Sequence, residues 1–327
     1  MDVVTFCTQS HVLVVAGKGG VGKTTMAAAL SRMAAQAGCS VLIVELEGKS
    51  GIAGAFGRTG DLDYEETVLW GDPARRGEGS VRGRRITPDD ALIEYLEDHG
   101  LGRVSRRLAR TGVLDVVATA IPGIRDVLVL GKVKQLERAR EADLIVVDAP
   151  ATGHAVTFLT SARGMVDAAR GGPLRAQAED VVEMLSDPSR CRVMLVTLPE
   201  ELPVSEAIES AYTLEDKAGV QLGPVIVNAC DPSPVGLERP AFEVVRAAGL
   251  EGAVPPAHVA ALEAAREFRL ARHMVSAEQV ERLGRELPLP HLLVPSLDAD
   301  RIGPAETQTL ADALAEAVGA LVPERAG

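Results

Sequence analysis

The sequence of 327 residues predicts an α/β fold, in which helices cover both faces of a mostly parallel β-sheet. Short apolar runs rich in β-branched residues recur along the chain, and a stretch with helical periodicity follows each of them. The runs are 11–16, 40–46, 143–149, 191–198, 224–229 and 291–295. Because these runs are continuously apolar rather than alternating, they indicate strands that are buried on both faces.

The predicted organisation is a single domain over 1–327 with two helical inserts that form a subdomain. The first insert, 87–141, begins at Thr87-Pro88, where a capping hydroxyl precedes a proline at the first helical position. The second insert, 155–190, also has helical periodicity.

Two further segments have recognisable patterns. Residues 71–85 are rich in glycine and arginine, which predicts a loop or the tip of a hairpin. The last helix, about 305–321, places Leu310, Leu314 and Leu321 on one face. Its charged residues are acidic, whereas a helix on an anionic membrane favours Lys and Arg, so we expect a core helix.

Composition and charge exclude several classes of protein. The net charge of -12 without a long basic block disfavours nucleic acid as a partner. The four cysteines are widely spaced and form no C-x-x-C pair, which predicts buried thiols rather than a metal site. The start of the chain lacks a signal peptide pattern, and the apolar stretch 112–136 is interrupted by charges and a proline. We therefore expect a cytoplasmic protein with no transmembrane segment.

A glycine-rich segment after the first strand predicts a nucleotide site. It has the pattern G-x4-G-K-T between a strand and a helical pattern, the context that makes this motif specific for phosphate binding. Backbone N–H groups of such a loop converge on the phosphates, Lys23 contacts the β- and γ-phosphates, and the Thr24 hydroxyl coordinates Mg²⁺. The predicted nucleotide-binding residues are Gly17, Gly19, Gly20, Val21, Gly22, Lys23, Thr24 and Thr25.

A second lysine, Lys18, follows the first glycine of this loop. The loop G-K-G-G-V-G-K-T-T thereby resembles the deviant Walker A loop of septum-site and partition ATPases, nitrogenase iron protein and arsenite-pump ATPases. The resemblance implies that Lys18 reaches across a dimer to the partner's nucleotide. There it would be catalytic, because it would stabilise charge on the transferring phosphoryl group as an arginine finger does.

The run D-A-P-A-T-G-H from Asp148 to His154 narrows the resemblance. It is similar to the D-T-A-P-T-G-H switch of the arsenite-pump ATPases and their relatives that target tail-anchored membrane proteins. The resemblance implies ATP and Mg²⁺ as cofactors, with Asp148 reaching the metal through water. It places Asn228 at the position that reads adenine and Pro295 in the backbone that closes over the base. His154 is either a packing residue or an element that senses the γ-phosphate.

The sequence departs from the family in its first switch. The family carries S-T-D-P-A-H, whose aspartate activates the attacking water, and alignment on the second strand places Glu47 at that aspartate. Glu47 is a candidate catalytic residue, but it is one methylene longer and is followed by Gly48, Lys49 and Ser50. Because such positioning is sensitive at the ångström scale, turnover is expected to be slow or to need a partner subunit.

Several absences point to a branch of the family without zinc or arsenite ligands. The inserts contain no cysteine triad for arsenite, and the chain has no C-x-x-C clamp for zinc. The expected function is an ATP-hydrolysing homodimer, or a heterodimer with a paralogous ATPase, that handles a protein client or membrane-protein partner. The alternatives are a partition- or septum-type positioning switch and a regulatory subunit of low activity. The apolar stretch 112–136 is either core or a client surface.

Overall fold

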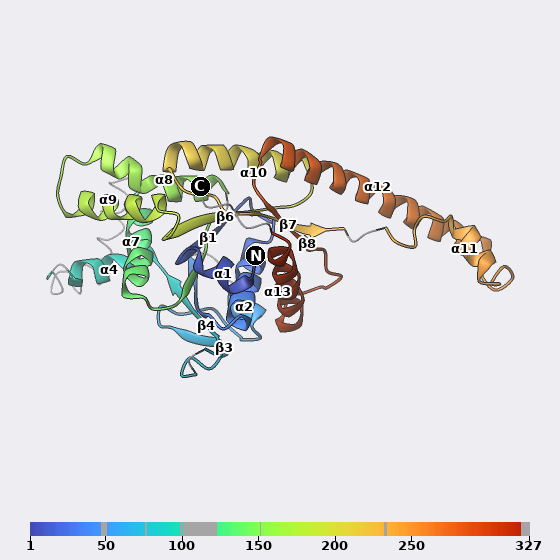
Figure 1. Ribbon diagram of the computed structural model, residues 1–327, viewed down its shortest axis with the longest axis horizontal. Coiled ribbons are helices and arrows are strands. Elements are labelled where there is room, and N and C mark those ends of the chain that lie inside the picture. Colours follow the sequence, from blue (N-terminus) through green and yellow to red (C-terminus); the bar gives the residue numbers. More distant parts are fainter. Residues whose placement is uncertain are drawn as a thin grey trace.

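The computed structural model describes residues 1–46, 51–75, 77–98, 100, 123–150, 152–231 and 234–321 (Figure 1). An eight-stranded sheet forms the centre of the molecule, in the order β3-β4-β2-β5-β1-β6-β7-β8. The strands are β1 (Val12–Ala16), β2 (Ser40–Leu46), β3 (Thr67–Gly71), β4 (Ser80–Ile86), β5 (Leu144–Asp148), β6 (Cys191–Thr197), β7 (Val225–Cys230) and β8 (His291–Pro295). All neighbouring pairs are parallel except β3 and β4. The predicted α/β class and mostly parallel sheet are therefore confirmed.

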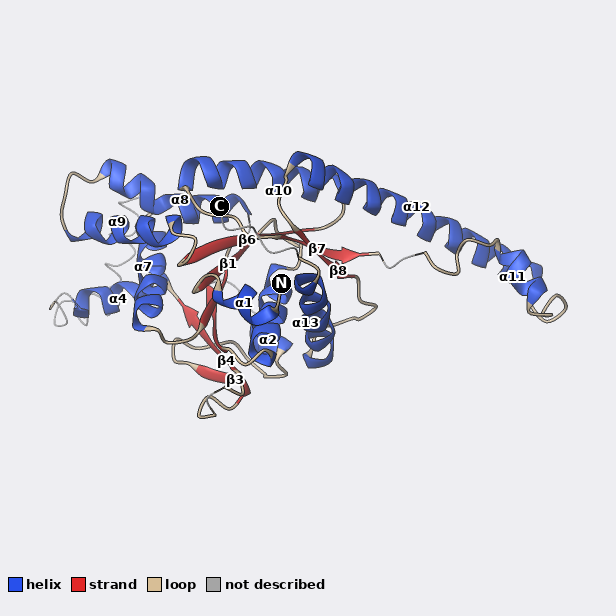
Figure 2. Ribbon diagram, in the orientation of Figure 1, coloured by secondary structure: helices blue, strands red, loops and turns tan. Residues whose placement is uncertain are grey.

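Helices pack on both faces of this sheet (Figure 2). The helices described are α1 (Val3–Thr8), α2 (Lys23–Gln36), α3 (Ile52–Ala55), α4 (Pro88–Asp98), α7 (Ile124–Ala139), α8 (Thr152–Ala168), α9 (Pro173–Ser186), α10 (Glu201–Thr213), the π-helical turn η1 (Leu214–Ala218), α11 (Ala241–Ala247), α12 (Pro256–Glu286) and α13 (Pro304–Gly319).

The core consists of two apolar clusters, one on each face of the sheet. Alternate residues of a strand enter opposite clusters, as Ile43 and Val44 of β2 do. Helices α2 and α13 cover one face, and Leu310 and Leu314 of α13 are buried there, which confirms the predicted core helix. Helices α7 to α10 cover the other face.

The segment 71–85 was expected to be a loop or the tip of a hairpin, and the structure has the hairpin, because β3 and β4 pair antiparallel there. The strand begins earlier than expected, since Ser80–Ile86 forms β4 and also pairs with β2. Its arginines disguise the strand, because their charges are satisfied locally: Arg82 bonds Glu66 at 2.5 Å and Arg84 stacks on the Tyr64 ring. Gly83 leaves room for the Leu69 side chain, since a Cβ there would lie 2.6 Å from Leu69 Cδ1.

The described part of the apolar stretch 112–136 belongs to the core. Residues 112–122 lie outside the described residues. Ile124, Val127, Leu128, Leu130 and Val133 of α7 are all buried in the cluster beneath the sheet. Core packing is therefore the interpretation that this half of the stretch supports.

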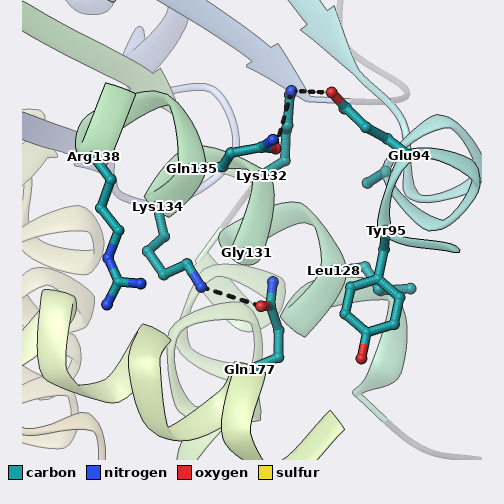
Figure 3. Close-up of a pocket in the computed structure, with 10 residues that line it drawn as sticks. Glu94, Tyr95, Leu128, Gly131, Lys132, Lys134, Gln135, Arg138 and Gln177 are labelled. Atoms are coloured by element: carbon teal, nitrogen blue, oxygen red, sulfur yellow. Dashed lines mark hydrogen bonds and ion pairs between the residues drawn. The ribbon is translucent and has the colours of Figure 1, made fainter. Parts of the chain in front are cut away.

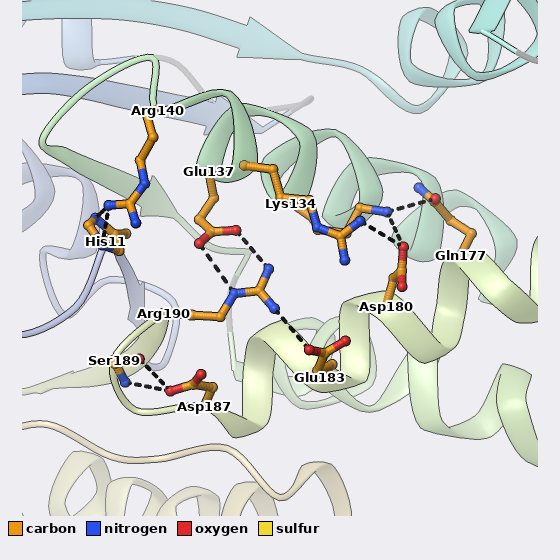
Figure 4. Close-up of polar contacts among 11 residues, drawn as sticks. His11, Lys134, Glu137, Arg140, Gln177, Asp180, Glu183, Asp187, Ser189 and Arg190 are labelled. Carbon is orange, nitrogen blue, oxygen red and sulfur yellow. Dashed lines mark hydrogen bonds and ion pairs between the residues drawn. The ribbon is translucent and has the colours of Figure 1, made fainter.

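Ion pairs attach α7 to its neighbours (Figure 4). Arg190, in the turn before β6, donates two hydrogen bonds to the Glu137 carboxylate, at 3.2 and 2.7 Å. Lys134 bonds Asp180 of α9 at 2.9 Å, and Arg138 bonds the same carboxylate at 3.1 Å. Bidentate pairing of this kind fixes helix orientation as well as adding stability. That the inserts act together as one subdomain remains a prediction.

Helices α11 and α12 form an arm that extends away from the sheet (Figure 1). The end of α12 nearest the body is anchored by buried Ser276, Gln279 and Leu283. Further out, large apolar side chains are exposed, including Phe268 at 65% and Met274 at 70%. Among the described residues, no helix is both long enough and apolar enough to cross a membrane.

Candidate functional site

The predicted phosphate loop joins the end of β1 to the start of α2. Its glycines are needed where the backbone approaches other segments closely. A Cβ on Gly17 would lie 2.3 Å from the Val196 carbonyl oxygen, and one on Gly22 would lie 2.4 Å from Asn228 Nδ2. Gly22 also has φ +91° as it begins α2. The loop is thus held against β6 and β7, with the N-terminus of a long helix behind it, an arrangement that favours anions.

Lys23 is folded back onto the loop. Its side chain is buried, and Nζ donates a hydrogen bond to the carbonyl oxygen of Lys18 at 2.6 Å. The lysine predicted to contact the β- and γ-phosphates therefore lies inside the loop that would hold them.

Thr24 and Asp148, which are 124 positions apart in the sequence, meet at the same edge of the sheet. The Thr24 hydroxyl donates to Asp148 Oδ2 at 2.6 Å, and Asp148 is fully buried at the end of β5, level with Val15 of β1. A hydroxyl and a carboxylate are the oxygen donors that Mg²⁺ prefers, and this cation usually keeps several waters and binds the nucleotide phosphates as well. The pair fits the predicted metal site, and when bound Mg²⁺ would neutralise charge on those phosphates.

Glu45, for which sequence reasoning assigned no role, lies beside this pair. It is 1% exposed and is level with Asp148 on the neighbouring strand. Burial raises the pKa of the Glu45 carboxyl; the backbone N–H of Ile52 and the charge of Arg85 oppose the rise, whereas Asp148 adds to it. In the sequence, Glu45 could have been noticed as a carboxylate near the end of an otherwise apolar predicted strand.

Lys18 points to a different element. Its ammonium group bonds Glu206 of α10 at 2.5 Å, and both side chains are about one-third exposed. The contact of Glu206 with Lys18 is a finding of the structure. The partner could have been suspected only from the fold, because α10 is 188 positions away in the sequence.

Asn228 and Pro295, predicted to lie at the base, are on adjacent strands. Asn228 Nδ2 donates to the Val21 carbonyl oxygen of the phosphate loop at 2.9 Å. Pro295 pairs with Cys230 across β7 and β8. A cavity of about 360 Å³ beside this edge is lined by Leu198, Pro199, Glu200, Ala229, Asp231, Arg272, Val275 and Ser276. Asn228 is thus brought to the phosphate loop, while its role toward a base stays a prediction.

Glu47, the predicted water-orienting residue, lies outside the described residues, as do Gly48, Lys49 and Ser50. His154 is the third residue of α8, and its side chain lies outside the described part of the structure. The predictions for these residues are therefore untested.

A second cavity, of about 190 Å³, lies among α4, α7 and α9 (Figure 3). Its lysines are already neutralised, because Lys132 bonds Glu94 at 2.5 Å and Lys134 pairs with Asp180. It includes none of the phosphate-loop residues, so we assign it no part in nucleotide binding.

The strand, glycine loop and helix, with a threonine hydroxyl bonded to a carboxylate on the neighbouring strand, define a P-loop nucleotide-binding protein. A family model described as anion-transporting ATPase (ArsA_ATPase) matches residues 10–168. ATPase BagA of Mycobacterium tuberculosis is 36% identical over 321 residues, covering 92% of each chain.

More distant relatives agree. The arsenical pump-driving ATPase of Acidiphilium multivorum is 28% identical over 232 residues, which cover 68% of this chain and 35% of that protein. ATPase GET3B of Arabidopsis thaliana is 24% identical over 275 residues, covering 71% of this chain and 67% of that protein. This chain belongs to the ArsA/GET3 family of ATPases, as the resemblance of its motifs predicted.

Proposed function

We propose that this chain binds ATP with Mg²⁺ at the phosphate loop, hydrolyses it, and uses the nucleotide state to control association with a second ATPase subunit while it handles a protein client. The observation that carries this proposal is the hydrogen bond between Thr24 and Asp148 at the mouth of the loop. It joins the two groups that a metal–nucleotide complex needs, from segments that only the fold brings together.

The position of Lys18 supports the proposal that ATP controls association with a second subunit. Lys23 turns into its own loop, whereas the Lys18 ammonium is directed to Glu206 on α10. A partly exposed lysine held by one carboxylate is available to exchange that partner for the nucleotide of another subunit, because an ion pair of this exposure is worth little, on the order of 1 kcal/mol.

The test is ATP-dependent sedimentation of the purified chain, with hydrolysis measured on the same samples. The wild-type chain is expected to form dimers with ATP and Mg²⁺. Lys18→Ala is expected to remain largely monomeric and to lose about 100-fold or more of its turnover, as an enzyme does on losing one preorganised charge. Lys217→Ala, which removes an exposed lysine on η1, is the control and should behave as wild type.

The outcomes separate the parts of the proposal. Unchanged association and turnover in Lys18→Ala would exclude a role across the interface. A wild-type chain that binds ATP but stays monomeric would contradict the homodimer. In that case a paralogous subunit becomes the proposed partner, and adding the co-purified subunit should restore turnover.

A further inference from the structure

Three polar residues form a row across the sheet at its nucleotide edge. Glu45 of β2 is level with Arg85 of β4 on one side and with Asp148 of β5 on the other. Glu45 follows Val41 and Ile43 in the alternation of β2, and both of these enter the apolar cluster that contains α2. Glu45 and Asp148 therefore project from the same face, the one on which Thr24 lies, and neighbouring strands are only about 4.8 Å apart.

The Glu45 carboxylate is buried and poorly hydrogen-bonded. It is 1% exposed, and although the Ile52 N–H lies near enough to lower its pKa, neither oxygen makes a hydrogen bond of standard geometry with the described residues. Buried polar atoms are nearly always bonded, because an unpaired one forfeits its bonds to water. Both oxygens of one carboxylate left in this state, beside the predicted metal-binding carboxylate, indicate a ligand that supplies the missing donors.

Arg85 does not remove this deficit. Its nearest nitrogen is 3.6 Å from Glu45, but 3.1 Å from Asp61, which is on the exposed side. Arg85 thus pairs more closely with Asp61 and leaves Glu45 as an acceptor facing the nucleotide edge.

We propose that Glu45 is a second acidic residue of the metal–nucleotide site, which accepts hydrogen bonds from the water shell of Mg²⁺ beside Asp148 and so sets the affinity of the site for the cation. It acts as a positioning residue. Mg²⁺ is commonly held by one or two carboxylates together with nucleotide phosphates and retained waters, which is the donor set that this edge offers. The inference rests on the proposed nucleotide function.

The test measures Mg²⁺ affinity rather than turnover, with a fluorescent ATP analogue and the full chain. The analogue is first titrated in EDTA, and Mg²⁺ is then titrated into the saturated complex. For Glu45→Gln, the half-saturating Mg²⁺ concentration is expected to rise about tenfold, as for the loss of a hydrogen-bonding partner around a bound metal. Binding in EDTA should be unchanged or tighter, because a negative charge beside the phosphates is gone.

Asp61→Asn is the matched control. It removes the closer partner of Arg85 but leaves Glu45 in place, so its Mg²⁺ midpoint should equal that of the wild type. A normal midpoint in a folded Glu45→Gln, or an equal rise in Asp61→Asn, overturns the inference. If Glu45→Gln does not fold, Glu45→Asp carries the test: it keeps the charge on a shorter side chain, and a midpoint identical to wild type overturns the role. Wild-type protein that binds no analogue in either titration contradicts the proposed function itself.

Discussion

The phosphate-loop edge of the sheet and the α11–α12 arm are built from different kinds of contact. At the loop, hydrogen bonds join distant segments: Asn228 bonds the Val21 carbonyl oxygen across 207 positions. On the arm, the described ion pairs are mostly local, such as Arg266 with Glu263 three positions earlier, at 2.6 Å. Large apolar side chains there face solvent.

The two regions differ in how firmly the fold fixes the positions of their side chains. Parallel strands place their carboxyl ends at one edge, so short motifs that follow different strands must converge. The arm has no such constraint, although an ion pair between Arg272 and Asp231 links α12 to the end of β7. Side chains at the loop should therefore control chemistry and stability strongly, and side chains on the arm should control neither.

The largest effect is expected at Lys23. Lys23→Ala removes the charge that is predicted to contact the phosphates, and hydrolysis should fall about 100- to 1,000-fold, the usual consequence of deleting one preorganised group. Steady-state phosphate release measures this, with Lys217→Ala as a control for general loss of positive charge. Turnover in Lys23→Ala within a few-fold of wild type would contradict the assignment of the loop as the active site.

A matched pair of truncations tests the same contrast in stability. Leu30 on α2 is buried, whereas Phe268 on α12 is 65% exposed. Leu30→Ala should lower the free energy of unfolding by about 3 kcal/mol through a lost side chain and a cavity. Phe268→Ala should change it by no more than about 0.5 kcal/mol. Urea denaturation followed by circular dichroism measures both, and a cost for Phe268→Ala close to that for Leu30→Ala would mean that the arm is packed in solution.

Much of the loop edge was predictable from sequence because each of its parts is local. The apolar run before Gly17, the glycines, and Asp148 at the end of another apolar run can each be recognised within ten residues. The remaining contacts of the site depend on strand register and helix packing. That Glu45 lies level with Asp148, and that Lys18 reaches Glu206, follows from strand order and helix packing, which no local pattern specifies.

Strand β4 is harder to predict from the sequence than the phosphate loop. Its arginines suggest a polar loop, because composition does not reveal which charges have partners. Carboxylates that pair with Arg82, Arg84 and Arg85 come from Asp61 and Glu66, in a segment with no periodicity of its own. The same difficulty hides the arm, where an amphipathic pattern cannot be read from a helix that is exposed over most of its length.

An effect smaller than that of Leu30→Ala is expected at Glu94 of α4, at the end of the molecule opposite the arm (Figures 1 and 3). Burial raises the pKa of this carboxyl, but hydrogen bonds from Lys132 and Tyr64 outweigh it, so that the pKa is lowered from its usual value. A lowered pKa means that the folded state favours the ionised carboxylate. Its contribution to stability is present above the unfolded-state pKa, near 4.3, and is lost as the pH falls through the folded-state value.

Glu94→Gln should therefore cost about 1 kcal/mol at pH 7, a fall of about 2 to 3 °C in Tm, since Lys132 is left buried without its anion. The difference in Tm between the wild type and the variant should shrink as the pH falls from 7 to 3, because the wild-type carboxyl becomes progressively protonated. Circular dichroism melts at pH 7, 5 and 3 measure this difference, with the exposed Glu65→Gln as a control that should show none. A gap between wild type and Glu94→Gln that persists unchanged at pH 3 would show that shape rather than charge at Glu94 holds α4 to α7.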